Sequence, residues 1–324
     1  MFDRRLSIAA LAAAIAFGLS TPPSLAQSDK QNVRVLVGMA AGGTTDITAR
    51  ALAEKLRESL GQTVTVENKI GAGQRIALNE VKLAAPDGRT LVVVTNSPFV
   101  IFPHTYAKLD YDPVRDFTPI SRILTFELAV AVGPKVPARS LKELISWAKA
   151  NPKQATFGSP GAGTLPHFLG IVLGKTVGVD LLHVPYKGAA SAMPDLVGGQ
   201  VPIMIDGLSA MAKLHDAGKI RFLASTGQRR SPLVPEVPTL KESGIDMTAE
   251  ITVSVYGPAK MPADVVRRLN MALVQAVTSP DFRDRFSATG LVPSPSTPEE
   301  LAANQAEQLR FWELPIKASG FKAD

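Results

Sequence analysis

Short apolar runs rich in β-branched residues alternate with longer segments of helical periodicity, and this alternation limits the fold more than any other feature of the chain. The first series reads as strand 33–37, helix 47–60, strand 64–66, helix 76–84 and strand 91–94. Strands separated by helices are typical of a mainly parallel sheet with helices on its faces. The sequence therefore predicts an α/β fold.

A second series of the same kind follows the first. Its expected members are the strands 128–132, 182–184, 203–205 and 222–224 and the helices 141–150, 165–176, 189–197 and 208–216. A last strand at 251–255 precedes three helical segments, at 263–277, 281–288 and 298–319. These helices need a sheet to cover, and we expect them to return to the first sheet. The predicted first domain is therefore discontinuous, residues 27–128 plus 250–324, and the second domain comprises residues 129–249.

The first 26 residues have the features of a secretory signal peptide. Arg4 and Arg5 precede an apolar run at 6–19, and the small residues Ser24 and Ala26 suit cleavage after Ala26. The alternative is a membrane anchor, but the run is shorter than the roughly 20 apolar residues that span a bilayer. We expect a mature protein that is exported to the periplasm, soluble and monomeric.

Composition and spacing argue against several classes of protein. The 324 residues include no cysteine, which rules out disulfide scaffolds, thiolate metal sites and cysteine nucleophiles. The net charge of +6 is small and the basic residues are scattered, so we expect no nucleic-acid partner. The four histidines show no metal-ligand spacing, and no nucleophile stands with a base. The sequence therefore predicts no catalytic residues, no metal site, no cofactor and no enzyme activity.

Two glycine turns lie at equivalent positions in the two series. Gly42-Gly43-Thr44-Thr45-Asp46 follows the first strand, and Ser159-Pro-Gly161-Ala-Gly163-Thr164 precedes the helix that begins near residue 165. Small residues let a ligand approach the backbone, and a helix start presents unpaired N–H groups to an anion. Ordinary helix capping by Thr44, Thr45 or Asp46 would also explain the first turn. If two domains face each other, both turns can point into one cleft, which favours a carboxylate or phosphate site.

Several further motifs occur in a fixed order along the chain. They are Gly61-Gln-Thr-Val-Thr-Val-Glu-Asn68, Ala85-Pro-Asp-Gly88, Tyr111-Asp-Pro113, Asp116-Phe-Thr-Pro119, His183-Val-Pro-Tyr-Lys-Gly188, Gly198-Gly-Gln-Val201, Arg229-Arg-Ser-Pro-Leu-Val-Pro-Glu-Val-Pro-Thr239 and Thr297-Pro-Glu-Glu300. Together with the first glycine turn they resemble the periplasmic solute receptors of tripartite tricarboxylate transporters, often called Bug receptors. The resemblance covers essentially the whole mature chain. It implies a fold similar to type II periplasmic binding proteins, with two α/β domains that close on a small carboxylate.

The resemblance also implies which residues contact the ligand. The backbone and hydroxyl groups of the two turns would hold a carboxylate, with help from loops after two other strands. The implied residues are Gly43, Thr44, Thr45, Asp46, Asn96, Ser97, Ser159, Gly161, Gly163, Thr164, His167, Tyr186 and Asp206. Two alternatives stay open, namely that Tyr186 packs between the domains and that His167 only satisfies a helix terminus.

The chain departs from the family pattern in two loops, the first of which helps to shape the cleft. Gly38-Met-Ala-Ala41 stands where the family usually has Phe-Pro-Pro, and Gly71-Ala-Gly73-Gln74-Arg75 stands where it usually has Gly-Ala-Gly-Gly. Arg75 adds either a cation near the cleft or a surface charge. The resemblance implies a receptor that delivers a small carboxylic acid to the subunits of a membrane importer. The alternatives are a receptor that presents its ligand to a sensor kinase, and an exported enzyme that uses the same cleft. The sequence does not name the acid.

Overall fold

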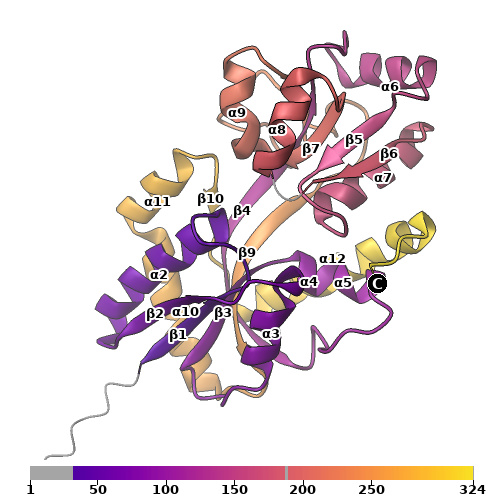
Figure 1. Ribbon diagram of the computed structural model, residues 1–324. Coiled ribbons are helices and arrows are strands. Elements are labelled where there is room, and N and C mark those ends of the chain that lie inside the picture. The colour runs from indigo at the N-terminus through magenta and orange to yellow at the C-terminus, as the bar shows by residue number, and fades with distance from the viewer. Residues whose placement is uncertain (1–31, 187–188, 324) are drawn as a thin grey trace, which may run out of the picture.

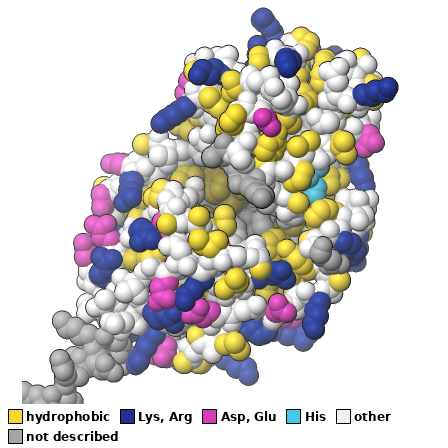
Figure 2. Space-filling model, in the orientation of Figure 1, with side chains coloured by type: hydrophobic (Ala, Val, Ile, Leu, Met, Phe, Trp, Pro, Cys, Tyr) yellow, Lys and Arg dark blue, Asp and Glu magenta, His cyan; other side chains and the backbone are white. Residues whose placement is uncertain are grey.

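The structure is a computed structural model that describes residues 32–186 and 189–323, and the predicted signal peptide at 1–26 lies outside these residues. Figure 1 shows two lobes joined by two long strands. The space-filling view in Figure 2 shows this face of the molecule hollowed between the lobes. Within the described residues, no helix is long and apolar enough to cross a membrane.

The first lobe contains both ends of the described chain. Its first part comprises β1 (Val33–Val37), α2 (Thr44–Leu60), β2 (Val64–Asn68), η1 (Ala72–Gln74), α3 (Arg75–Lys82), β3 (Thr90–Thr95), α4 (Ser97–Val100) and α5 (Phe102–Thr105). Its last part comprises β9 (Glu250–Pro258), α10 (Ala263–Thr278), α11 (Pro280–Ser287), β10 (Val292–Pro293) and α12 (Pro298–Ser319). The late helices therefore pack against the strands of the first lobe.

The sheet of the first lobe has the strand order β2-β1-β3-β9-β4, in which β4 is the strand Phe117–Val132. β1 pairs in parallel with β2 and β3, whereas β9 runs antiparallel to both β3 and β4. One face packs an apolar cluster with residues of α2, α10 and α11, and the other face packs residues of α3, α4 and α12. Because β1, β2 and β3 are parallel, the loops that follow them emerge at one edge of the sheet.

The second lobe repeats this arrangement with one contiguous stretch of chain. It comprises α6 (Leu141–Ala150), β5 (Thr156–Ser159), α7 (Leu165–Val177), β6 (Leu182–Pro185), α8 (Ala189–Gly198), β7 (Ile203–Gly207), α9 (Leu208–Asp216) and β8 (Arg221–Ser225). β5 pairs in parallel with β6 and β7, so the loops after these three strands also share one edge. Both lobes are thus parallel over three strands and antiparallel beyond them.

One strand, β4 (Phe117–Val132), belongs to both lobes. Its residues 117–127 pair with β9, and its residues 128–132 pair with β7 and β8. The sequence predicts only the second part, 128–132. The first part contains Pro119 and two irregularities of register, between Pro119 and Ser121 and between Arg122 and Leu124. These breaks remove the regular alternation that marks a strand in a sequence.

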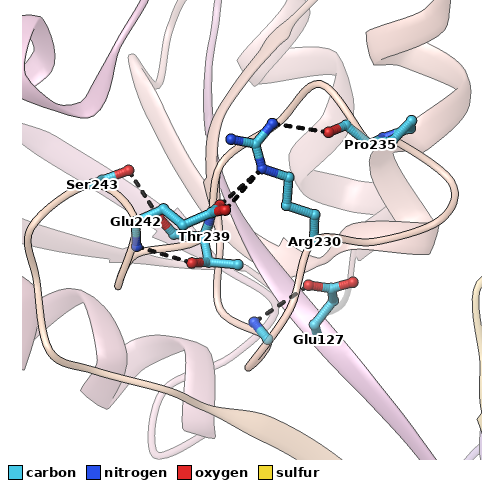
Figure 3. A network of polar contacts seen from close by, with 7 residues as sticks. Glu127, Arg230, Pro235, Thr239, Glu242 and Ser243 are labelled. Carbon is cyan, nitrogen blue, oxygen red and sulfur yellow. Dashed lines mark hydrogen bonds and ion pairs between the residues drawn. The ribbon is translucent and has the colours of Figure 1, made fainter.

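A buried threonine, Thr226, joins the two segments in which the chain crosses between the lobes. The Thr226 hydroxyl accepts the N–H of Leu128 at 2.8 Å and donates to the carbonyl of Ala249. Figure 3 shows the network beside it, in which Glu127 accepts the N–H of Gly227 at 3.3 Å and Arg230 pairs with Glu242 at 2.9 Å. Glu127 also lies directly opposite Glu250 in the β4–β9 ladder. These bonds join the loop that follows β8 to β4 and to Ala249, the residue before β9.

Candidate functional site

The first glycine turn joins β1 to α2 and leaves the start of that helix uncapped. Gly42 has φ +83°, a conformation that favours glycine, and Gly43 is the N-cap residue with no side-chain capping bond. Among the described residues, no group accepts the N–H of Thr44, Thr45 or Asp46. Thr44 is exposed at the surface, whereas Thr45 is buried. The turn therefore offers free backbone donors at the positive end of a helix of 17 residues.

Asp46 holds this turn together from inside. Its Oδ2 accepts the N–H of Gly42 at 2.9 Å and Arg50 Nε at 3.0 Å, and its Oδ1 accepts Asn68 Nδ2 at 2.9 Å. Burial would raise the pKa of Asp46, but the hydrogen bonds from Arg50, Gly42 and Asn68 outweigh burial and lower it. Asp46 is thus a buried carboxylate with both oxygens occupied. Arg50 and Asn68, which sequence reasoning missed, are its partners.

The loop after β2 braces the loops after β1 and β3. Gln74 is buried in the left-handed conformation at φ +77°, and its Nε2 donates to the Thr95 hydroxyl at 2.8 Å. A Cβ added to Gly38 would lie 2.5 Å from the Gln74 Cβ, so only glycine fits there. Arg75 stacks over the ring of Tyr106 at 4.3 Å and donates from Nε to the Ala72 carbonyl. Within the described residues, Arg75 has no carboxylate partner.

Asn96 and Ser97 follow β3 at the same edge. The Asn96 side chain donates to the Glu250 carbonyl at 3.1 Å, and its backbone N–H donates to the Thr252 carbonyl. Its Oδ1 is buried with no hydrogen-bond partner among the described residues. Asn96 also lines a cavity of about 80 Å³, together with Arg122 of β4. Ser97 begins the short helix α4 and is half-buried.

The second glycine turn joins β5 to α7 and is closed by two hydroxyl groups. Ser159 Oγ and Thr164 Oγ1 both donate to the Gly161 carbonyl, at 3.0 and 2.7 Å. Thr164 is the N-cap of α7 but makes no side-chain capping bond, and Gly163 has φ +75°. Within the described range, the N–H groups of Ala162 and Thr164 have no acceptor. The free donors of this turn are therefore in the backbone, and Ala162 is one that sequence reasoning missed.

Two stacked imidazole rings lie behind the second turn. His167 Nδ1 accepts the N–H of Gly163 at 3.1 Å, and His183 Nε2 lies 2.7 Å from Ser159 Oγ. The ring centroids of the two histidines are 3.8 Å apart. Burial, with a smaller contribution from His183, lowers the pKa of His167 to about 3, and burial lowers the pKa of His183 to about 4. Both rings are neutral near pH 7, as the acceptor role of His167 requires.

Tyr186 and Asp206 lie at the same edge of the second sheet. The Tyr186 hydroxyl donates to Asp195 at 2.8 Å, which directs the side chain toward α8, and its ring covers Gly158. Asp206 Oδ1 accepts the N–H of Gly207 at 2.7 Å, whereas its buried Oδ2 has no partner among the described residues. Burial raises the pKa of Asp206 to about 6.

The predicted site residues therefore form two groups, one at the carboxyl edge of each sheet. Within the described part of the chain, no hydrogen bond or ion pair joins the first turn to the second. No cluster of three or more histidine, aspartate or glutamate side chains suited to a metal ion occurs among the described residues.

Comparison with known proteins decides the family. Residues 48–321 match the family model described as the tripartite tricarboxylate transporter family receptor. The chain belongs to this receptor family. The UPF0065 protein in gbd 5'region of Cupriavidus necator is 36% identical over 98% of this chain and 97% of its own length. The resemblance read from the sequence motifs is confirmed.

Two solved structures show the same fold. Rhodopseudomonas palustris Rpa4515 with adipate is 30% identical, with a TM-score of 0.81 over 90% of this chain and 98% of that one. MatC from Rhodopseudomonas palustris with bound malate is 29% identical, with a TM-score of 0.77 over 88% of this chain and 98% of that one. The predicted two-lobed α/β fold of a periplasmic binding protein is thereby confirmed. The family is one of periplasmic solute receptors, some of which bind carboxylates.

Proposed function

We propose that this receptor binds a small carboxylic acid between its lobes in the periplasm and delivers the acid to the membrane subunits of a tripartite tricarboxylate-type importer. The observation that carries the proposal is the pair of uncapped helix starts, α2 and α7, each preceded by a glycine turn. Backbone N–H groups at a helix start bind anions without a charged side chain. The carboxylates in the two solved relatives support the same ligand class.

The ligand contacts and the domain division are part of this proposal. The free N–H groups of Thr44 and Thr45 and those of Ala162 and Thr164 would bind one carboxylate from opposite sides. Gly43, Gly161 and Gly163 would let the carboxylate approach the backbone. Asp46, Ser159 and His167 would position the turns, because their polar atoms are bonded within them. We place the domain boundaries at 128/129, one residue after β4 changes partners, and at 249/250, directly before β9 begins.

One substitution removes a proposed donor with little change to the fold. Thr44 is the first residue of α2, where proline is tolerated, and the extended Gly43 (φ −78°, ψ 166°) is compatible with a following proline. Thr44→Pro deletes one free N–H group, whereas Thr44→Ala keeps it and serves as the matched control. A hydrogen bond to a charged group contributes about 1.5–3 kcal/mol. We therefore expect Thr44→Pro to weaken carboxylate binding roughly 10-fold or more and Thr44→Ala to change it little.

The ligand itself is found by a thermal-shift screen and measured by calorimetry. The panel contains adipate, malate, citrate, a monocarboxylate and an aromatic acid, each of which raises the unfolding temperature if it binds the native state. Binding should also reduce the radius of gyration in solution scattering, since one anion reaches both turns only when the lobes approach. The proposal fails if no acid binds, or if Thr44→Pro binds as tightly as the unchanged protein. Capture of importer subunits by the liganded receptor tests delivery.

A further inference from the structure

The last described residues run between the two lobes, beside the second glycine turn. Helix α12 ends at Ser319, and Gly320 follows in the left-handed conformation at φ +71°. The N–H of Ala323 donates to the Thr105 carbonyl at 3.0 Å, which fixes the chain to α5 of the first lobe. On the other side, Lys175 of α7 donates to the Ala318 carbonyl. Residues 318–323, here called the C-terminal segment, therefore contact both lobes.

Phe321 is the aromatic residue of this segment that contacts the second lobe. Its ring meets His167 edge-on, with centroids 4.8 Å apart and planes at 77°. It meets Phe168 in the same way, at 5.4 Å and 79°. A Cβ added to Gly163 would lie 3.8 Å from the edge of the Phe321 ring, which is ordinary contact distance. Phe321 therefore packs on the start of α7 and on the turn before it.

His167 connects this packing to both ends of the turn. It accepts the N–H of Gly163 on one side, and its ring stacks on His183, which is bonded to Ser159. Of the two free backbone N–H groups of this turn, that of Ala162 lies between Ser159 and Gly163, and that of Thr164 follows Gly163 directly. Any rotation of the His167 ring would break the bond to Gly163 and change where those N–H groups point. The ring of Phe321, with its centroid 4.8 Å from that of His167, limits that rotation.

We propose that Phe321 is a positioning residue for the second anion-binding turn, and that the C-terminal segment transmits the position of the first lobe to this turn. The proposal rests on the proposed function and adds a residue that lies outside both glycine turns. Phe321 acts through His167 and does not contact the ligand. If Phe321 holds the turn in its binding geometry before the ligand arrives, the ligand does not have to order the turn. Removing the Phe321 ring should therefore weaken binding.

The test compares Phe321→Ala with a control on the neighbouring helix. Phe311 is 46% exposed on α12, and its ring contacts Trp312. Phe311→Ala therefore removes an aromatic ring without disturbing the second turn. Phe321→Tyr keeps the aromatic ring and should bind the acid as tightly as the unchanged protein. Loss of two edge-to-face contacts predicts binding about 3- to 10-fold weaker in Phe321→Ala, measured by calorimetry with the tightest-binding acid of the panel above.

A second readout needs no ligand. The ring ¹⁵N shifts of His167 and His183 in the free protein report the neutral tautomers and their titration with pH. In Phe321→Ala we expect the His167 ring to gain solvent contact and to titrate at a higher pH, while Phe311→Ala leaves it unchanged. Unaltered affinity together with unaltered histidine shifts would overturn the positioning role. If no acid binds but the histidine shifts change in Phe321→Ala, Phe321 does position His167, and it is the proposed function that is wrong.

Discussion

Replacing Asp206 by asparagine should stabilise the ligand-free receptor at neutral pH. The side chain is 7% exposed, its Oδ2 lacks a partner among the described residues, and burial raises its pKa to about 6 from 3.8. The folded state therefore holds this proton more tightly than the unfolded state does. At about 1.4 kcal/mol for each pKa unit, the ionised form opposes folding by about 3 kcal/mol at pH 7.5. Asparagine keeps the shape and the acceptor for Gly207 without the charge.

The effect has a defined pH window. The protonated carboxyl favours the folded state fully below about pH 4, and this contribution is lost as the pH rises through about 6. Urea unfolding at several pH values should show Asp206→Asn more stable by up to about 3 kcal/mol at pH 7.5 and equal to the unchanged protein near pH 4. Asp216→Asn, at an exposed carboxylate ending α9, is the control. A difference that does not vary with pH would refute the reasoning.

Two further substitutions test the crossing point and the first turn. Thr226→Val should lower the free energy of unfolding in urea by about 2–4 kcal/mol, because it leaves the N–H of Leu128 and the carbonyl of Ala249 buried without a partner. Thr226→Ser keeps the hydroxyl and should recover most of this loss. Asp46→Asn should cost about 1–2 kcal/mol at pH 7, since it removes a charged acceptor shared by Gly42 and Arg50. The lowered pKa of Asp46 means that its stabilisation is present above about pH 4 and is lost as the pH falls further. A cost equal at pH 7 and pH 2.5 would contradict that assignment.

The helices and most strands could be predicted because their signals are local. The last helix is predicted at 298–319 and observed there, and it begins with a capping box in which Thr297 and Glu300 bond each other's backbone. The short helices α4 and α5 were missed, since four residues contain too little periodicity to recognise. The antiparallel places of β4 and β9 were also not predicted, because strand order depends on contacts between distant segments.

The candidate site shows the same division between local and distant information. The glycine turns and their helix starts are visible in the sequence, because glycine and N-cap positions follow from local backbone geometry. The hydrogen-bond partner of each side chain, in contrast, cannot be read from the sequence. His183 lies 24 residues from the Ser159 that it contacts, and Asn68 lies 22 residues from Asp46. Phe321 contacts His167 only because the last helix returns across the molecule.

The central place of β9 in the first sheet has a consequence for the order in which the chain folds. β9 lies between β3 and β4, and it pairs Val253 with Thr95, so this contact closes a loop of about 160 residues. The second lobe, by contrast, is one contiguous stretch whose contacts can form locally and therefore sooner. Until β9 arrives, the edges of β3 and β4 stay unpaired, and unpaired strand edges are sites of aggregation. A chain cut before residue 250 would keep both edges open, so early termination should yield an insoluble product rather than a smaller receptor.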